Sequence, residues 1–212
     1  MINLNNNDPL NIKHMKRIKD TLNKSLMEYR RTMVLRVDLR MPENSPYEKD
    51  STLITRFMES LKSQKNADRL NKISLRKRTH HCRIRHVWVR EFNQNGKKHY
   101  HLALFFNQEA YAYPGTYKPD QEGKYRHNLA YMIMEAWVRA LHLNQEENYQ
   151  QYYRLIEFPD NCHARLNMYG LSYENDYAVI AMLNILYQLQ TDHAPLPGHG
   201  LFLLCRLIRN YP

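Results

Sequence analysis

Glu91 and the pair His99 and His101 are the residues of this chain whose types and spacing best suit metal chemistry. Side chains alternate between the two faces of a β-strand, so His99 and His101 would project from one face about 7 Å apart. Two imidazoles and one carboxylate form a common ligand set for a divalent ion, and Mn²⁺ and Mg²⁺ suit it equally. The three residues therefore predict a divalent metal site. The open alternative is that these histidines face solvent or DNA without a metal.

A β-hairpin would bring Glu91 to the histidines. Residues 82–91 alternate polar and apolar side chains, residues 98–106 begin the same way, and Asn95-Gly96 between them is typical of a tight turn. Residues equidistant from the turn share a face in an antiparallel pair, so Glu91 is expected opposite His99 or one step away. A register slip of one residue would move Glu91 to the other face.

The remaining hydrophobic pattern predicts an α+β fold, with a central, mainly antiparallel sheet flanked by helices and an N-terminal amphipathic helix. We expect one domain overall, with the N-terminal helix in residues 1–30 and the main body of the domain in residues 31–212. The hairpin is expected to supply central strands, and Ser51 is expected to cap the second helix. The predicted helices are 10–30, 51–70, 127–143 and 173–190, and the further strands are 33–39 and 153–158; residues 201–208 fit either type.

The composition favours an anionic partner. Lys and Arg number 31 against 21 Asp and Glu, which gives a net charge of +10. Nucleic acid is the first candidate, because no apolar run is long enough to span a membrane and the N-terminus lacks the apolar core of a signal peptide. A cytoplasmic protein without a membrane partner is expected. Cys82, Cys162 and Cys205 are widely separated, which argues against a disulfide framework and structural zinc.

Two segments could contact nucleic acid. Basic residues are concentrated before and within the first hairpin strand, where they suit phosphate contacts or form an ordinary solvated surface: Arg76, Lys77, Arg78, Arg83 and Arg85. The loop after the hairpin interleaves Tyr111, Tyr113 and Tyr117 with Pro, Gly and Lys. These tyrosines could stack on the bases of a single strand, or equally pack against the sheet edge.

Four sequence segments resemble the inovirus-type replication proteins of phages and prophages, which are HUH endonucleases that initiate rolling-circle replication. The segments are RVDLR (36–40), VWVREF (87–92), HYHLALFFN (99–107) and EAWVRAL (135–141), and the similarity covers roughly residues 31–190. The resemblance implies an HUH endonuclease-like fold and a metal held by Glu91, His99 and His101. It also implies single-stranded or nicked origin DNA as the substrate and a replication helicase of the host as a partner.

The same resemblance implies a tyrosine nucleophile that becomes linked to a 5′-phosphate. The family places this tyrosine in a Tyr-x-x-Lys motif, and the matching residue here is Tyr187, with Tyr177 as the alternative. Gln190 stands where the motif has Lys, and a neutral amide is less able to lower the pKa of the tyrosine or to hold the phosphate. A non-catalytic nucleic-acid-binding protein on the same fold, or a metal-dependent RNase, therefore stays an alternative function.

Overall fold

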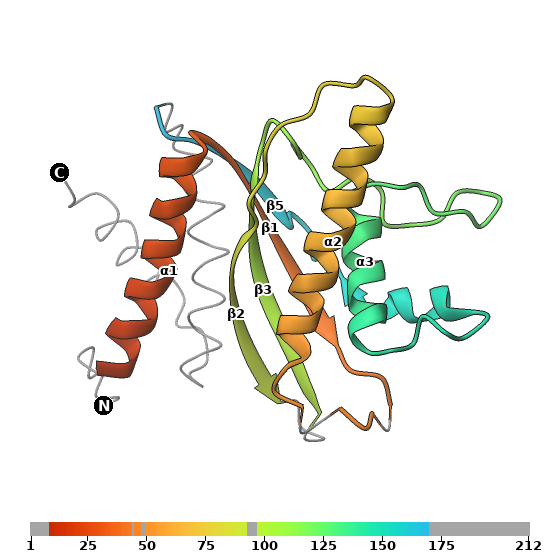
Figure 1. Cartoon of the computed structure of the whole chain (residues 1–212). Coiled ribbons are helices and arrows are strands. Elements are labelled where there is room, and N and C mark those ends of the chain that lie inside the picture. Colours follow the sequence, from red (N-terminus) through yellow and green to blue (C-terminus); the bar gives the residue numbers. More distant parts are fainter. Residues whose placement is uncertain (1–8, 44, 48–49, 93–96, 170–212) are drawn as a thin grey trace.

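Residues 9–43, 45–47, 50–92 and 97–169 are described by the computed structural model and form an α+β fold (Figure 1). Its sheet has five strands and every strand pairing is antiparallel, which confirms the predicted fold class. The elements in chain order are α1 (Pro9–Glu28), β1 (Arg31–Arg40), α2 (Leu53–Ser74), β2 (Arg85–Phe92), β3 (Lys98–Asn107), α3 (Leu129–Ala140), the 3₁₀ helix η1 (Tyr149–Leu155), β4 (Ile156–Glu157) and β5 (His163–Asn167).

Strands β1 and β3 lie at the centre of the sheet. The order is β2-β3-β1-β4, and β5 pairs with the same side of β1 as β4, nearer to the start of that strand. Strand β3 is central as expected, because both of its faces are buried over most of its length. Strand β2 pairs with β3 alone among the described strands, so the expectation of a central position is wrong for β2.

Helices α2 and α3 cover one face of the sheet and bury its core. Alternate residues of the two central strands point to this face, from Met33 to Leu39 in β1 and from Tyr100 to Phe106 in β3. The ring of Trp137 on α3 packs edge-on against Phe57 and Tyr100, with centroids 6.0 Å away in both cases. Its indole N–H donates to the carbonyl oxygen of Arg40 at 2.8 Å, which ties α3 to the end of β1.

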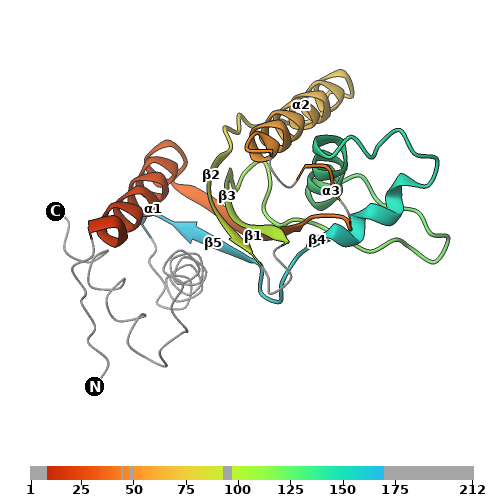
Figure 2. The same cartoon turned by 90° about the horizontal axis from the view of Figure 1, so that it is seen from below.

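Helix α1 lies on the opposite face of the sheet from α2 and α3, as the two views in Figures 1 and 2 show. Ile18 and Leu22 of this helix are buried. Glu28 at its end forms an ion pair with Arg85 at the beginning of β2. Helix α1 is therefore attached to the hairpin through Arg85, at the end of β2 that lies farther from Glu91 and His99.

Near η1 the structure differs from the prediction in one strand and adds another. Residues Tyr149–Leu155 form a 3₁₀ helix, so the strand predicted over 153–158 is reduced to Ile156–Glu157. Tyr153 explains the difference, because its side chain is buried and donates a hydrogen bond to the carboxylate of Glu135 on α3. Strand β5 was not predicted, although Ala164 and Leu166 alternate with exposed residues as expected of a strand with one buried face.

The second helix spans Leu53–Ser74 rather than the predicted 51–70, and its N-cap is Thr52 rather than Ser51. The carboxylate of Asp50 explains this start. It accepts hydrogen bonds from the backbone N–H and the hydroxyl of Thr52, both at 2.7 Å, and it pairs with Arg56 in the first turn. These bonds lower the pKa of Asp50 to about 2.

The described residues test only part of what the sequence predicts about the cysteines and about membrane-spanning helices. Cys82 and Cys162 are both buried free thiols, while Cys205 lies outside the described residues. The predicted helix 173–190 and the ambiguous segment 201–208 also lie outside them. Within the described part of the chain, no helix combines the length and the apolar character needed to cross a membrane.

Candidate metal centre

The hairpin register places Glu91 directly opposite His99, which is the closer of the two predicted arrangements. Val89 pairs with His101, so Glu91 is also the diagonal neighbour of His101 on the same face. This face is the one opposite α2 and α3, because the intervening residue Tyr100 points into the core. The strand alternation and the pairing therefore bring all three side chains together.

The three side chains form a compact cluster. Oε2 of Glu91 lies 3.0 Å from Nε2 of His99 and 3.1 Å from Nε2 of His101. One nitrogen or carboxylate oxygen from each residue lies within 4.8 Å of the other two. The imidazole rings of the two histidines meet nearly at right angles, with centroids 4.9 Å apart.

This donor set fits a small divalent ion. An octahedral ion with bonds of about 2.1 Å has neighbouring ligands separated by roughly 3.0 Å. The separations from Oε2 of Glu91 to Nε2 of His99 and to Nε2 of His101 match that spacing. Two imidazoles with one carboxylate on one side of an ion leave the opposite positions open for water or a substrate oxygen. Glu91, His99 and His101 could therefore hold a catalytic type of ion rather than a closed structural one.

Asp38 of β1 supports the cluster from the neighbouring strand. It pairs opposite His101, and its Oδ1 lies 2.9 Å from Nδ1 of that imidazole. The ring nitrogen is poorly aligned with this oxygen, so the contact is electrostatic rather than a linear hydrogen bond. Nε2 of the same ring faces Glu91, so Asp38 helps to set which nitrogen points to the ligand cluster.

Arg36 in turn holds Asp38 with two hydrogen bonds, from Nε at 3.1 Å and from Nη2 at 2.9 Å. Burial raises the pKa of the Asp38 carboxyl, but the nearby His101 and Arg36 outweigh burial and lower it below its ordinary value. The carboxylate is therefore kept charged beside the imidazole. Arg36 was not identified as a site residue from the sequence, and its only local signal is that it shares a strand face with Asp38.

The cluster is open on one side. The side chain of His101 is 10% exposed, whereas those of His99 and Glu91 are 24% and 36% exposed. Arg40 lies opposite His99 on β1 and forms an ion pair with Glu157 of β4. A phosphodiester could therefore reach the cluster from the solvent side, past a rim that includes a guanidinium group.

The predicted basic residues lie at the other end of the hairpin. Arg76, Lys77 and Arg78 are exposed and follow the end of α2, and Arg83 is exposed just before β2. Arg85 shares its strand face with Glu91 but is paired with Glu28 of α1. The structure therefore does not bring these residues to the metal cluster. Tyr177, Tyr187 and Gln190 lie outside the described residues.

Comparison with known proteins shows relatives across most of the chain. A family model described as the YagK/YfjJ C-terminal domain matches residues 2–191, a range that contains Glu91, His99, His101, Tyr177 and Tyr187. The uncharacterized protein YagK of Escherichia coli strain K12 is 30% identical over 191 residues, covering 84% of this chain and 87% of YagK. The uncharacterized protein YfjJ of the same strain is 35% identical over 172 residues, covering 76% and 78%. No solved structure matches.

Proposed function

The chain belongs to the YagK/YfjJ C-terminal domain family, and we propose that it is a metal-dependent enzyme that cuts and rejoins single-stranded DNA. The observation that carries this proposal is the cluster of Glu91, His99 and His101, with its ligand atoms within 4.8 Å of one another. The net charge of +10 supports an anionic substrate. We further propose that it acts in the cytoplasm, at the start of replication of a phage or prophage element, as the resemblance to inovirus-type replication proteins implies.

Each residue of the cluster has a role in this proposal. A divalent ion bound by the three ligands would act as a Lewis acid on a phosphate oxygen. Asp38 orients the imidazole of His101 through the contact at 2.9 Å. The partly exposed side of Glu91 and His99 admits the phosphodiester, past Arg40 at the rim, which is paired with Glu157.

The proposed nucleophile is the hydroxyl of Tyr187, with Tyr177 as the alternative. Its oxygen forms a bond to the scissile phosphorus while the bond from phosphorus to the 3′ oxygen breaks. The tyrosine proton is lost to solvent, and the departing 3′ oxygen takes up a proton to become a free hydroxyl. One phosphodiester is exchanged for another, so the 5′-phosphotyrosine link conserves the bond energy. The strand can therefore be rejoined by the reverse reaction.

A non-catalytic nucleic-acid-binding protein is the second candidate, and two observations favour it. Gln190 stands where the resembled motif has Lys. In addition, Oε2 of Glu91 lies within hydrogen-bonding distance of both histidines, so the cluster is held together by its own side chains. In that case Glu91, His99 and His101 would be a structural hydrogen-bonded group facing the strand.

The deciding experiment incubates the full chain with end-labelled single-stranded DNA and Mn²⁺ and looks for a covalent adduct on a denaturing gel. Tyr187→Phe, Tyr177→Phe and His101→Ala are compared with His142→Asn. His142 is exposed, and it has a positive φ of 56° that Asn tolerates, which makes it a suitable histidine control.

An adduct that is lost in Tyr187→Phe and His101→Ala but kept in His142→Asn supports the proposed enzyme. An adduct that survives Tyr187→Phe and is lost in Tyr177→Phe moves the nucleophile to Tyr177. DNA binding without an adduct or cleavage supports the non-catalytic protein and overturns the nicking proposal.

A further inference from the structure

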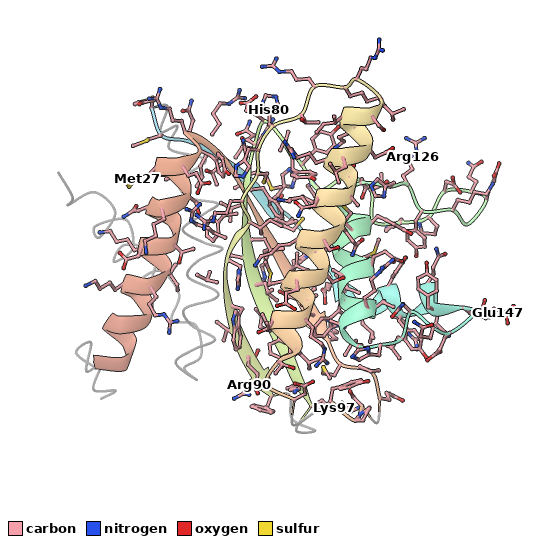
Figure 3. The ribbon with its side chains drawn as sticks, in the orientation of Figure 1. Met27, His80, Arg90, Lys97, Arg126 and Glu147 are labelled. Atoms are coloured by element: carbon pink, nitrogen blue, oxygen red, sulfur yellow. The ribbon has the colours of Figure 1, made fainter. Side chains whose placement is uncertain are left out.

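A cavity of about 520 Å³ lies far from the metal cluster, between the last turns of α2, the segment after β3 and the first turn of α3. Gln108, which lines the cavity, follows the last residue of β3, and the extended chain from His99 to Gln108 is roughly 30 Å long at about 3.3 Å per residue. Figure 3 shows this separation: Arg90 and Lys97 lie at one end of the sheet, next in sequence to the metal cluster, and His80 and Arg126 lie toward the other. The cavity also lies on the α2 and α3 side of the sheet, opposite the cluster.

One wall of the cavity is held in place by a buried carboxylate. Asp68 of α2 accepts a hydrogen bond from the hydroxyl of Tyr111 at 3.1 Å and pairs with Lys72 at 2.7 Å. Burial and the adjacent Asp68 both raise the pKa of Tyr111, so its hydroxyl stays protonated and keeps donating. Nε2 of His127 lies 3.4 Å from the other oxygen of Asp68.

A second wall is fixed by close packing of the loop against α3. Gly115 has a φ of +86°, and a Cβ atom there would lie 2.7 Å from Cγ of Asn128. The side chain of Asn128 donates to the carbonyl oxygen of Thr116 at 2.8 Å and caps α3 by accepting from the N–H of Tyr131 at 2.9 Å. The backbone N–H of Ala130 donates to Pro114 at 2.8 Å. The first turn of α3 is thus partly occupied, and an anion in the cavity needs side-chain cations.

Tyr113 and Lys77 are the groups on this cavity that are most available to a ligand. Tyr113 is 67% exposed, and within the described residues it packs against no other aromatic ring. Lys77 is exposed and forms no ion pair with the described part of the chain. An exposed aromatic ring and a cation on the lining of one cavity suit a nucleotide, whose base stacks and whose phosphate is anionic. The cavity volume also falls within the usual range for small-ligand sites.

A smaller cavity of about 50 Å³ adjoins the first and extends the basic lining. The two share Asp68, Lys72, Glu109, Ala110 and Tyr111 as walls, and the smaller one adds Arg69, Arg78, Thr79 and His80. Glu109 is paired with Arg31 at 2.7 Å, so its charge is balanced. The cations therefore continue past the space for one nucleotide, which favours a strand with successive phosphates over a free nucleotide.

We propose that this cavity binds one nucleotide of a single-stranded nucleic acid, with the base stacked on Tyr113 and its phosphate held by Lys77. The neighbouring phosphate lies toward Arg78. The choice of a strand as the ligand rests on the function proposed above, but the site itself does not need the metal cluster. The cavity would bind the strand roughly 30 Å from the proposed place of cleavage.

The test measures binding of a fluorescein-labelled oligo-dT 20-mer to the full chain by anisotropy, in EDTA so that cleavage cannot occur. Tyr113→Ala and Lys77→Ala are compared with Tyr169→Ala and Lys24→Ala, which change an exposed tyrosine and an exposed lysine outside the cavity lining. We expect Tyr113→Ala to weaken binding at least about five-fold, since loss of one stacked base typically costs that much or more. Lys77→Ala should reduce the slope of the logarithm of the binding constant against the logarithm of the salt concentration by about one. The Kd of both controls should stay within about two-fold of wild type.

Equal binding by the cavity variants and their controls would overturn the proposal. Competition with unlabelled dTMP distinguishes a site for free nucleotides from a site for a nucleotide within a strand. If dTMP displaces the oligonucleotide at concentrations near the oligonucleotide Kd, the site binds free nucleotides and the strand assignment is overturned. Adduct formation with Mn²⁺ is scored separately in wild type. Cavity-dependent binding without an adduct would defeat the nicking proposal alone, and an adduct with unchanged binding in the cavity variants would defeat the cavity proposal alone.

Discussion

Asp38 lies directly opposite His101 on adjacent strands, and Oδ1 of its carboxylate is 2.9 Å from Nδ1 of the imidazole. The two residues are brought together by the pairing of β1 with β3, and the other imidazole nitrogen faces Glu91. The cluster of Glu91, His99 and His101 is therefore a three-strand arrangement, in which β2 and β3 carry the three candidate ligands and β1 carries a carboxylate that contacts one of them.

Replacing Asp38 should weaken metal binding without removing a ligand. We expect Asp38→Asn to lower the affinity for Mn²⁺ by roughly 10- to 100-fold, because groups that orient a metal-bound histidine typically contribute that much. Titration calorimetry measures the affinity, and Asp160→Asn, an exposed carboxylate near β5, serves as the matched control. Unchanged Mn²⁺ affinity in Asp38→Asn would show that the contact with His101 has no positioning role.

Adding Mn²⁺ should stabilise the folded protein through one site. At a free Mn²⁺ concentration one hundred times Kd, a single site adds about 2.7 kcal/mol to the free energy of unfolding. This corresponds to a rise in Tm of roughly 5–10 °C for a chain of this size. His99→Ala and His101→Ala should abolish the rise, EDTA should reverse it, and His142→Asn should keep it. A rise that persists in both ligand variants would place the ion elsewhere.

Gly115→Ala should destabilise the protein more than the same change at Gly123. Both glycines have a positive φ, +86° and +77°, which costs an alanine about 1–2 kcal/mol. Only at Gly115 would the new Cβ also meet a neighbour, the Asn128 side chain at 2.7 Å, whereas nothing lies within 4 Å at Gly123. We expect a loss of about 2–3 kcal/mol for Gly115→Ala and about 1 kcal/mol for Gly123→Ala, measured by urea unfolding. Equal losses would mean that Asn128 moves aside without cost.

Mild acid should destabilise the protein partly through His86. Burial lowers the pKa of His86 below its ordinary value of 6.5, and the charge of Lys62 lowers it further. The unfolded chain then takes up a proton before the folded protein does, so stability falls as the pH drops through about 6.5. His86→Gln should make the free energy of unfolding less dependent on pH between 7.5 and 5.5. Parallel curves for the variant and wild type would contradict this prediction, because His163 and the other histidines titrate in both proteins.

The grouping of Glu91, His99 and His101 could be predicted from the sequence because it depends on neighbouring residues of one hairpin. Alternation along a strand puts His99 and His101 on one face whatever surrounds the hairpin, and a short connection restricts Glu91 to one or two register positions. The same local logic identified the helices α1, α2 and α3, whose apolar residues recur at helical spacing. It did not distinguish η1 from a strand, because the tyrosines of Tyr149–Leu155 suit both and contact with α3 decides between them.

Tertiary structure alone decided which distant residues meet. Nothing local to β1 states that Asp38 will pair with His101, since that contact depends on the register between two strands joined through α2 and β2. The cavity lined by Asp68, Tyr111 and His127 likewise draws on three separate segments, and the opposite faces of the sheet separate it from the metal cluster. Periodicity sets which face a side chain occupies, but long-range pairing and packing set its neighbours, because these are chosen by burial of the whole core.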